Sequence, residues 1–313
     1  AALGIAALWV GFSASAREQE RIVVEVYTGG PSDIYIMNAD GSDFLNLTQQ
    51  SESRNRWPAP SPDGRQIAFT SRRNGRFVTY VMDIDGSNVR RVGDGSMAEW
   101  SPDGSRLVVT GRPGEGDNVD LYILDVETGA LTQLTDRAND DNHADWSPDG
   151  RHIAFQSHEG GEWFNGNMDT SVSVVDVQTG VVTRLTDEPG RESSPRWSPD
   201  GSRIAFNNEA VEMLSMDTDG GAVRDLSEEV GSNPDWSADG SRIVYGGFAH
   251  AVRFDDTSDT YVMDADGRNG SRIQMHRGPM LGARWLRAAS LAVNPFRGRP
   301  STWGWLKGRA GGE

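Results

Sequence analysis

The sequence predicts an all-β protein: a six-bladed β-propeller with four-stranded antiparallel blades and a ring closed by both ends of the chain. Three observations predict this fold. A Trp-Ser-Pro-Asp-Gly motif recurs at regular intervals, hairpin turns ending in Gly alternate with it, and the short runs between them are rich in β-branched and aromatic residues. With 37 Gly and 14 Pro among 313 residues, the composition favours many tight turns over long helices.

The Trp-Ser-Pro-Asp-Gly motif sets the period of the repeat. Copies begin at Trp100, Trp146, Trp197 and Trp236 (the last with Ala for Pro), and a fifth begins at Pro60, with proline in the Trp position. Successive copies lie 40, 46, 51 and 39 residues apart, close to the length of one propeller blade. Complete units are therefore predicted over residues 60–93, 100–135, 146–186, 197–227 and 236–276.

Each unit divides into four predicted strands. Strand a ends at the Trp position, strand b is the apolar run that follows, and strands c and d flank a turn such as Asp85-Gly86, in which both residues tolerate a positive φ. The sixth blade is shared by the two ends: residues 22–28, 33–37 and 44–47 supply strands b, c and d, and residues 282–286 supply strand a. This closure removes exposed sheet edges.

Charge and cysteine content exclude several functions. The net charge is −16, and it is uneven: residues 1–266 carry 21 basic and 45 acidic side chains, whereas residues 267–313 carry nine basic ones and one acidic one. An acidic body argues against nucleic acid as a partner, because phosphates need a basic surface. The absence of Cys excludes disulfides, thiolate metal sites and thiol catalysis. No cofactor is expected.

The two ends of the chain differ from the repeat. Residues 1–16 are apolar, too short to span a membrane, and similar to the core of a secretory signal, with Ala14 and Ala16 as small residues of a cleavage site. An uncleaved anchor helix is the alternative, and both interpretations predict export. Residues 295–313 are basic and contain Trp303 and Trp305. They are expected either to cross the acidic propeller as a strap or to contact a membrane or the cell envelope. The propeller itself is assigned to residues 17–294.

Over residues 21–294 these repeated Trp-Ser-Pro-Asp-Gly and Asp-x-Asp-Gly units resemble the propeller of TolB and related periplasmic proteins. The resemblance implies the propeller fold and a periplasmic setting. About 20 residues precede the first predicted strand, so we expect no counterpart of the α/β domain that precedes the propeller in TolB. Some polysaccharide lyases built on related repeats carry a histidine-rich metal site, which supplies an enzymatic alternative.

Most of the repeated residues are predicted to serve the fold. The motif aspartates should accept local hydrogen bonds in their turns, against the alternative of calcium binding, and the repeated Trp should pack one blade on the next, against the alternative of a ligand platform. The motif aspartates are Asp63, Asp103, Asp149, Asp200 and Asp239.

Candidate binding residues lie on the face that carries the d–a and b–c loops, opposite the face of the a–b turns and c–d hairpins. The long loop over residues 156–169 contains Trp163 and Phe164, which either bind a sugar or protein partner or fold back onto the blade. Strand a lines the central channel of a propeller, so the residues before each Trp position form a ring: Ala59, Glu99, Asp145, Arg196, Asp235 and Arg284. Three positions before each Trp position, the sequence has Trp57, Met97, His143, Ser194, Asn233 and Gly282. Such a ring either binds a peptide terminus or polar ligand, or satisfies itself through salt bridges.

The charge of this face is predicted to be two-sided, which favours a protein or peptide partner. One side carries Arg54, Arg56, Arg72, Arg73 and Arg76, and the other Asp136, Asp140, Asp141, Glu159, Glu162 and Asp169. If a metal is bound, its ligands would be His143 and His158 with Glu159 or Asp145, although solvated or channel-lining histidines are the simpler interpretation.

These observations predict an exported, monomeric, non-enzymatic scaffold, periplasmic or secreted, that binds a protein or peptide. The alternative is a carbohydrate-active propeller that cleaves or binds acidic oligosaccharides through His143, His158 and the arginine cluster. A hydrolase is excluded, because the chain has no Gly-x-Ser-x-Gly nucleophile elbow.

Overall fold

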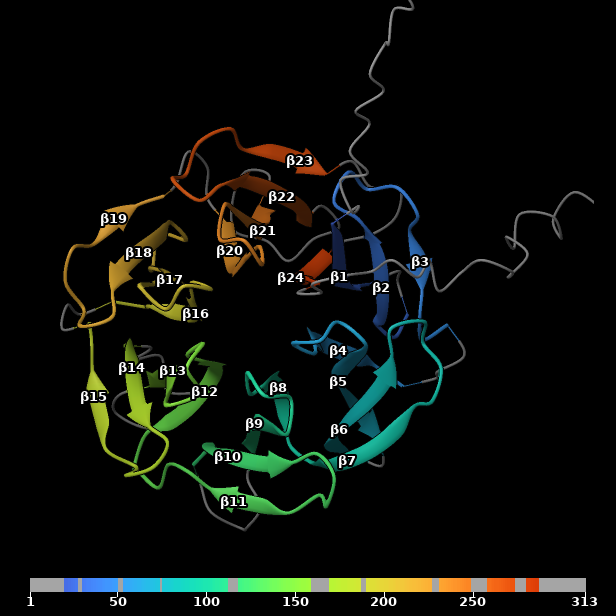
Figure 1. The fold of residues 1–313 in the computed structure, drawn as a ribbon, viewed down its shortest axis with the longest axis horizontal. Helices are drawn as coiled ribbons and strands as arrows, with labels where there is room; N and C mark the ends of the chain where they lie inside the picture. The colour runs from blue at the N-terminus through green and yellow to red at the C-terminus, as the bar shows by residue number, and fades with distance from the viewer. Residues whose placement is uncertain are drawn as a thin grey trace, which may run out of the picture.

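The fold is a ring of β-sheets (Figure 1). A computed structural model of the chain describes residues 20–27, 30–49, 53–73, 75–111, 118–158, 169–186, 190–226, 231–248, 258–273 and 280–286. The described strands form six four-stranded antiparallel sheets, which confirms the predicted all-β, six-bladed propeller. Within the described ranges no helix has the length and hydropathy that a membrane crossing requires.

Five blades are continuous in the sequence. Blade 1 comprises β4 (Asn55–Pro60), β5 (Gln66–Arg73), β6 (Arg76–Asp83) and β7 (Arg90–Asp94). Blade 2 comprises β8 (Ser96–Trp100), β9 (Arg106–Gly111), β10 (Asp120–Asp125) and β11 (Leu131–Gln133). Blade 3 comprises β12 (Asp140–Trp146), β13 (His152–His158), β14 (Thr170–Asp176) and β15 (Val182–Arg184).

Blade 4 comprises β16 (Ser193–Trp197), β17 (Arg203–Asn207), β18 (Met213–Asp217) and β19 (Arg224–Asp225). Blade 5 comprises β20 (Gly231–Trp236), β21 (Arg242–Phe248), β22 (Ser258–Asp264) and β23 (Ser271–Ile273). In every blade the first strand lies nearest the centre of the ring and the fourth lies at the rim (Figure 1).

Blade 6 joins the two ends of the described chain, as the sequence predicts. It comprises β24 (Met280–Trp285), β1 (Arg21–Val26), β2 (Asp33–Asn38) and β3 (Leu45–Asn46). Strand β24 pairs antiparallel with β1, with Ile22 opposite Trp285, and the Leu286 amide donates to the Arg21 carbonyl at 2.9 Å. The ring is therefore held closed by packing and hydrogen bonds between segments that are far apart in sequence.

The repeated Trp packs between blades, as predicted. All five Trp residues at the motif position are between 2% and 8% exposed. Trp100 of blade 2 also donates its indole Nε1–H to the Ala59 carbonyl of blade 1 at 2.9 Å. The apolar residues of each second strand complete the same interblade layers, for example Ile153 and Phe155, which lie in one cluster with Trp146. Burial of this large apolar surface is the main stabilising term of the fold.

The motif aspartates are turn residues, also as predicted. In each Ser-x-Asp-Gly turn the aspartate accepts the hydroxyl of the Ser two residues before it and the amide two residues after it. For Asp103 these bonds measure 2.7 Å from Ser101 and 3.0 Å from Ser105. The Ser101 hydroxyl bond, followed by the Ser105 amide bond, lowers the pKa of Asp103 to about 2. The pKa of Asp149, Asp200 and Asp239 is lowered for the same reason.

These turns predict a loss of stability in acid. Because the pKa of Asp103 is lower in the folded state than in the unfolded chain, its contribution is present above pH 4 and is lost as the pH falls toward 2. Asp103→Asn is expected to lower the free energy of unfolding at neutral pH by about 1 kcal/mol, a value reduced by solvent screening of an exposed carboxylate. Urea unfolding at pH 7 and at pH 2.5 measures both effects: the difference between variant and wild type should be much smaller at the lower pH, which lies just above the folded-state pKa of Asp103. An undiminished difference there would contradict the assignment.

Candidate functional site: the centre of the ring

A β-bulge interrupts the first strand of every blade. In blade 1 the pairing with β5 shifts between Arg56 and Ala59, so two residues of β4 stand opposite one. The same shift occurs in all six blades. The first residue of each bulge has a positive φ between 49° and 59°. We call these the bulge residues: Trp57, Met97, His143, Ser194, Asn233 and Gly282.

The bulge residues share a backbone but not a chemistry. A bulge of this kind favours glycine at its first residue, because a side chain in the left-handed region costs about 1–2 kcal/mol. Only Gly282 meets that preference, and the other five positions carry an indole, a thioether, an imidazole, a hydroxyl and an amide. Backbone strain retained at five of six equivalent positions is a feature of sites whose side chains have a use beyond the fold.

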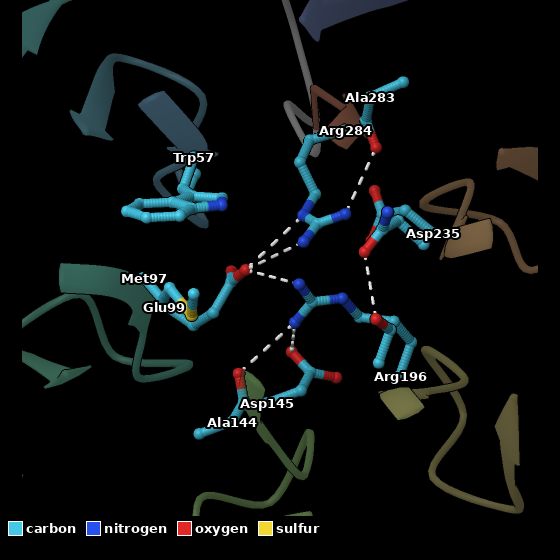
Figure 2. Close-up of polar contacts among 12 residues, drawn as sticks. Trp57, Met97, Glu99, Ala144, Asp145, Arg196, Asp235, Ala283 and Arg284 are labelled. Carbon is cyan, nitrogen blue, oxygen red and sulfur yellow. Dashed lines mark hydrogen bonds and ion pairs between the residues drawn. The ribbon is translucent and has the colours of Figure 1, made fainter. Parts of the chain in front are cut away.

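An ion-pair network, the axial cluster, occupies the centre of the ring below the bulge residues. Its members are Glu99, Asp145, Arg196, Asp235 and Arg284, the charged residues of the predicted ring (Figure 2). Arg196 Nη2 lies 2.7 Å from Glu99 Oε1, and its Nη1 lies 3.4 Å from Asp145 Oδ1. Arg284 Nη2 lies 3.3 Å from the same Glu99 oxygen. The predicted residues are therefore brought together, in the self-pairing arrangement that was one of the two alternatives.

The axial cluster ties together blades that are not neighbours. Glu99 of blade 2 holds Arg196 of blade 4 and Arg284 of blade 6 through one carboxylate oxygen. Two other carboxylates connect adjacent blades through backbone amides: Asp145 accepts the amide of Trp197, and Asp235 that of Trp285, both at 2.7 Å. Blades 2 to 6 are joined at the axis in this way. Blade 1 is not, because it has the uncharged Ala59 at the equivalent position.

The electrostatics of the cluster centre on Arg196, whose side chain is 3% exposed. Burial works to lower the pKa of its guanidinium, but the carboxylates of Glu99, Asp145 and Asp235 offset this, so that the pKa is raised. Its Nε has no hydrogen-bond partner in the described structure. Three carboxylates and two guanidiniums leave the cluster with a formal charge of −1.

Blade 1 carries a second ion pair, joined to the bulge residue Trp57. Arg56 Nε lies 2.9 Å from Glu25 Oε1 of blade 6, and the Trp57 amide donates to the other Glu25 oxygen at 3.2 Å. Burial raises the pKa of Glu25, and the charge of Arg56 opposes that rise. The Arg56 guanidinium also stacks 4.3 Å from the centre of the Trp57 ring. The Trp57 ring lies beside the axial cluster, facing Glu99 and Arg284 (Figure 2).

The two histidines of the predicted metal alternative lie in one hydrogen-bonded chain. His143 Nδ1 lies 2.8 Å from Asn142 Oδ1, and the Asn142 amide nitrogen lies 3.1 Å from His158 Nε2, which is also 3.2 Å from the Gln156 amide nitrogen. This pattern makes Nδ1 the protonated nitrogen of His143 and Nε2 of His158 an acceptor. Burial, then Arg196 and His158, lower the pKa of His143 to about 4, so its ring is neutral at physiological pH. The described residues contain no group of three or more acidic or histidine side chains arranged to hold a metal ion.

The predicted acidic side of the face is partly wrong. Asp140 and Asp141 were placed on the surface, but the structure buries both: they are 4% and 0% exposed. Asp141 pairs with Arg137 at 2.7 Å and accepts the Ser157 hydroxyl at 2.8 Å, and Asp140 accepts the Val119 amide at 2.6 Å. Burial raises the pKa of Asp141. Asp140 therefore joins blade 3 to blade 2, and Asp141 joins blade 3 to the connection that leads into it.

Several predicted residues lie outside the described part of the chain. These are residues 1–16, Trp163 and Phe164, Glu159 and Glu162, and the tail over 295–313. Sequence reasoning in turn missed Glu25, Phe77 and the Arg137–Asp141 pair. Glu25 had a signal, since it is the one charge inside the apolar run from Ile22 to Val26. The other two had none, because their contacts depend on how neighbouring blades meet.

Comparisons with known proteins agree with the sequence resemblance. Residues 12–110 match the family described as TolB beta propeller domain. The Tol-Pal system protein TolB of Francisella tularensis subsp. mediasiatica is 29% identical over 182 residues, which cover 57% of this chain and 40% of that protein. The chain thus spans less than half of this relative.

Solved structures share the fold at low sequence identity. The structure of TolB from Acinetobacter baumannii aligns with a TM-score of 0.71 and 22% identity, over 85% of this chain and 66% of that one. An oligogalacturonate lyase in complex with manganese aligns with a TM-score of 0.52 and 17% identity, over 80% and 72% of the two chains. At these identities the likeness shows the fold and leaves the activity open. Taken with the family match over residues 12–110 and the named relative, it shows a β-propeller that is similar to those of TolB proteins.

Proposed function

We propose that the protein is an exported scaffold, periplasmic or secreted, that binds a protein or peptide at the d–a side of the ring without chemical turnover. The observation that carries this proposal is the set of bulge residues. In a repeat protein the positions that recur in every blade serve the fold, whereas these six positions share a strained backbone and differ in chemistry. They stand at the centre of the face formed by variable loops, where a rigid scaffold usually binds its partners.

The axial cluster supports binding more than catalysis. Its guanidiniums pair with its carboxylates, so it forms a rigid, polar floor beneath the bulge residues. A serine nucleophile needs a base within reach of its hydroxyl. Among the described bulge residues, the Ser194 hydroxyl instead contacts Asn233 Oδ1 at 2.9 Å, and the His143 ring contacts Asn142. Export is supported by the name of the relative, a Tol-Pal system protein, and by the apolar residues 1–16.

Trp57→Gly is the variant that separates binding from folding. Glycine suits the φ of 51° at this position, so the relief of strain offsets part of the lost packing of a half-buried ring. We expect the free energy of unfolding to stay within about 2 kcal/mol of wild type. We expect recovery of the native partner to fall by at least about tenfold, which corresponds to 1.4 kcal/mol of binding free energy. The measurement is quantitative mass spectrometry of proteins cross-linked to the chain in its native cell-envelope fraction.

The control for this variant is Ala222→Gly. Ala222 also has a positive φ, 46°, but it is exposed in a c–d hairpin on the opposite side of the ring. This substitution relieves the same kind of strain and should leave partner recovery unchanged. Equal recovery with Trp57→Gly and Ala222→Gly would refute a partner site at the bulge residues. Absence of the wild-type chain from both the envelope fraction and the culture medium would refute export.

A further inference from the structure

A cationic and aromatic surface covers the d–a side of blade 1, the blade that contributes no charge to the axial cluster. We call it the blade 1 platform. It comprises Arg54, Arg56, Trp57, Arg72, Arg76 and Phe77, from the start of β4 and the hairpin between β5 and β6. The Arg72 amide donates to the Arg54 carbonyl, and Arg72 stands opposite Phe77 in the pairing of β5 with β6. These residues therefore form one row across the three inner strands of the blade.

The platform is a ladder of alternating guanidiniums and rings. Arg56 stacks on Trp57 at 4.3 Å, the Trp57 and Phe77 ring centres are 5.9 Å apart with their planes at 58°, and Arg72 lies 5.6 Å from the Phe77 ring. Phe77 is 42% exposed, which makes it one of the most exposed large apolar side chains described. Stacking of this kind fixes the planes of the guanidiniums and leaves N–H groups at their edges for an acceptor.

The charge of the platform is largely uncompensated. Arg56 is paired with the buried carboxylate of Glu25. The side chains of Arg54, Arg72 and Arg76 are exposed, and none forms an ion pair with a residue of the described structure. Three guanidiniums that lack an ion pair within the described structure are a local exception on a chain of net charge −16, although Arg72 Nε donates to the Gly75 carbonyl at 3.4 Å. Their charge attracts an anionic partner and repels a cationic one.

We propose that the blade 1 platform binds an acidic peptide segment that carries an aromatic side chain among its carboxylates. This inference rests on the proposed function and names the class of its partner. Arg54, Arg72 and Arg76 would hold the carboxylates, and the aromatic side chain would pack against the pair of rings formed by Trp57 and Phe77. Two rings packed at 58° suit edge-to-face contact with a further aromatic side chain and offer no continuous flat surface for a sugar ring. Trp57 belongs both to the blade 1 platform and to the bulge residues, so a peptide bound on the platform would extend directly to the bulge residues.

Binding of a synthetic peptide tests this proposal. The probe is a short fluorescein-labelled peptide of glutamates around a central phenylalanine, titrated with the full chain at low salt and followed by fluorescence anisotropy. Arg72→Ala/Arg76→Ala is expected to weaken binding by at least about tenfold. The matched control is Arg65→Ala/Arg151→Ala, which removes the same charge from two exposed arginines of a–b turns on the opposite side. It should change the affinity by less than about twofold. Arg56 is left in place, because its loss would strand the buried Glu25 carboxylate.

A double-mutant cycle tests the contact between Phe77 and the aromatic side chain of the peptide. Phe77→Ala should weaken the phenylalanine peptide by about tenfold and should have no further effect on the same peptide with alanine at its centre. Four results overturn the proposal: equal loss with the arginine pair and its control, no coupling between Phe77 and the peptide ring, binding of an oligogalacturonate in place of the peptide, or self-association of the chain through this surface in sedimentation. If the peptide fails to bind while Trp57→Gly still loses the native partner, the partner class is wrong and the proposed function stands.

Discussion

Replacing Arg196 with methionine is expected to lower the free energy of unfolding by about 3–5 kcal/mol at neutral pH, the usual cost of removing one partner of a buried ion pair. The side chain of Arg196 is 3% exposed, and it is the only cation within ion-pair distance of Asp145 among the described residues. Methionine fills a similar volume but leaves the Asp145 carboxylate without its cation in a site with little access to water, and leaves Glu99 with Arg284 alone. Urea unfolding measures the loss.

Two further variants decide whether burial is the cause. Arg272→Met removes an ion pair with the same separation, 2.7 Å to Asp259, but the Arg272 side chain is 55% exposed, so we expect a loss below about 1 kcal/mol. Adding Asp145→Asn to Arg196→Met removes the stranded charge while Glu99 keeps its ion pair with Arg284, and should restore part of the stability. Equal losses in Arg196→Met and Arg272→Met would show that the axial cluster contributes no more than a surface ion pair.

The residues of the axial cluster form a floor beneath the candidate site, because their charged groups are already engaged with one another and with backbone amides. Each of its carboxylates is engaged by a guanidinium or a backbone amide of another blade. A ligand that displaced one of these contacts would leave a buried charge unpaired. The side chains of the bulge residues are uncharged, so a ligand that contacts them leaves no buried charge unpaired. This difference supports the proposal that a ligand is recognised one layer above the cluster, toward the d–a loops.

The blades could be predicted because the information is repeated. Each Trp-Ser-Pro-Asp-Gly copy contains a turn whose geometry is local, so the Ser101–Asp103 hydrogen bond follows from residues two positions apart. The sixth blade could be predicted from the count alone, since Trp285 and the run from Ile22 to Val26 lacked partners in their own segments. Local propensity and the period of the pattern agreed throughout.

The candidate site was predicted only in part, because its geometry is not local. The ring positions followed from counting back from each Trp, but the bulge that gives Trp57 a positive φ leaves no mark in a sequence with Gly at only one of the six positions. The burial of Asp141 depends on Arg137, which enters from the connection between blades 2 and 3. Exposed and buried carboxylates look alike in a sequence, and the acidic side of the face was overestimated for that reason.

Trp285→Ala is the substitution expected to open the ring. Trp285 is 2% exposed and packs with Ile22 and Val24 of β1, and its ring lies 4.9 Å from the Arg242 guanidinium. Truncation of a buried Trp costs about 3–5 kcal/mol. Here the truncation also acts on a contact between distant parts of the chain, because β24 is joined to β1 by pairing and packing and not by a turn. Strand β24 should therefore separate from β1 before the other blades unfold.

Trp146→Ala is the matched control for this prediction. Trp146 is 3% exposed, lies 5.1 Å from the Arg106 guanidinium and, like Trp285, has no partner for its indole nitrogen in the described structure. Its strand, however, continues through a tight turn into β13, where the Ser147 amide donates to the His152 carbonyl. We expect the two variants to lose similar amounts of global stability. Hydrogen exchange separates them, measured at the Leu286 amide, which donates to Arg21, and at the Ser147 amide. Exchange at Leu286 in Trp285→Ala should accelerate at least about tenfold more than exchange at Ser147 in Trp146→Ala. Equal acceleration at the two amides would mean that closure does not depend on Trp285, and that the pairing of β24 with β1 alone holds the propeller shut.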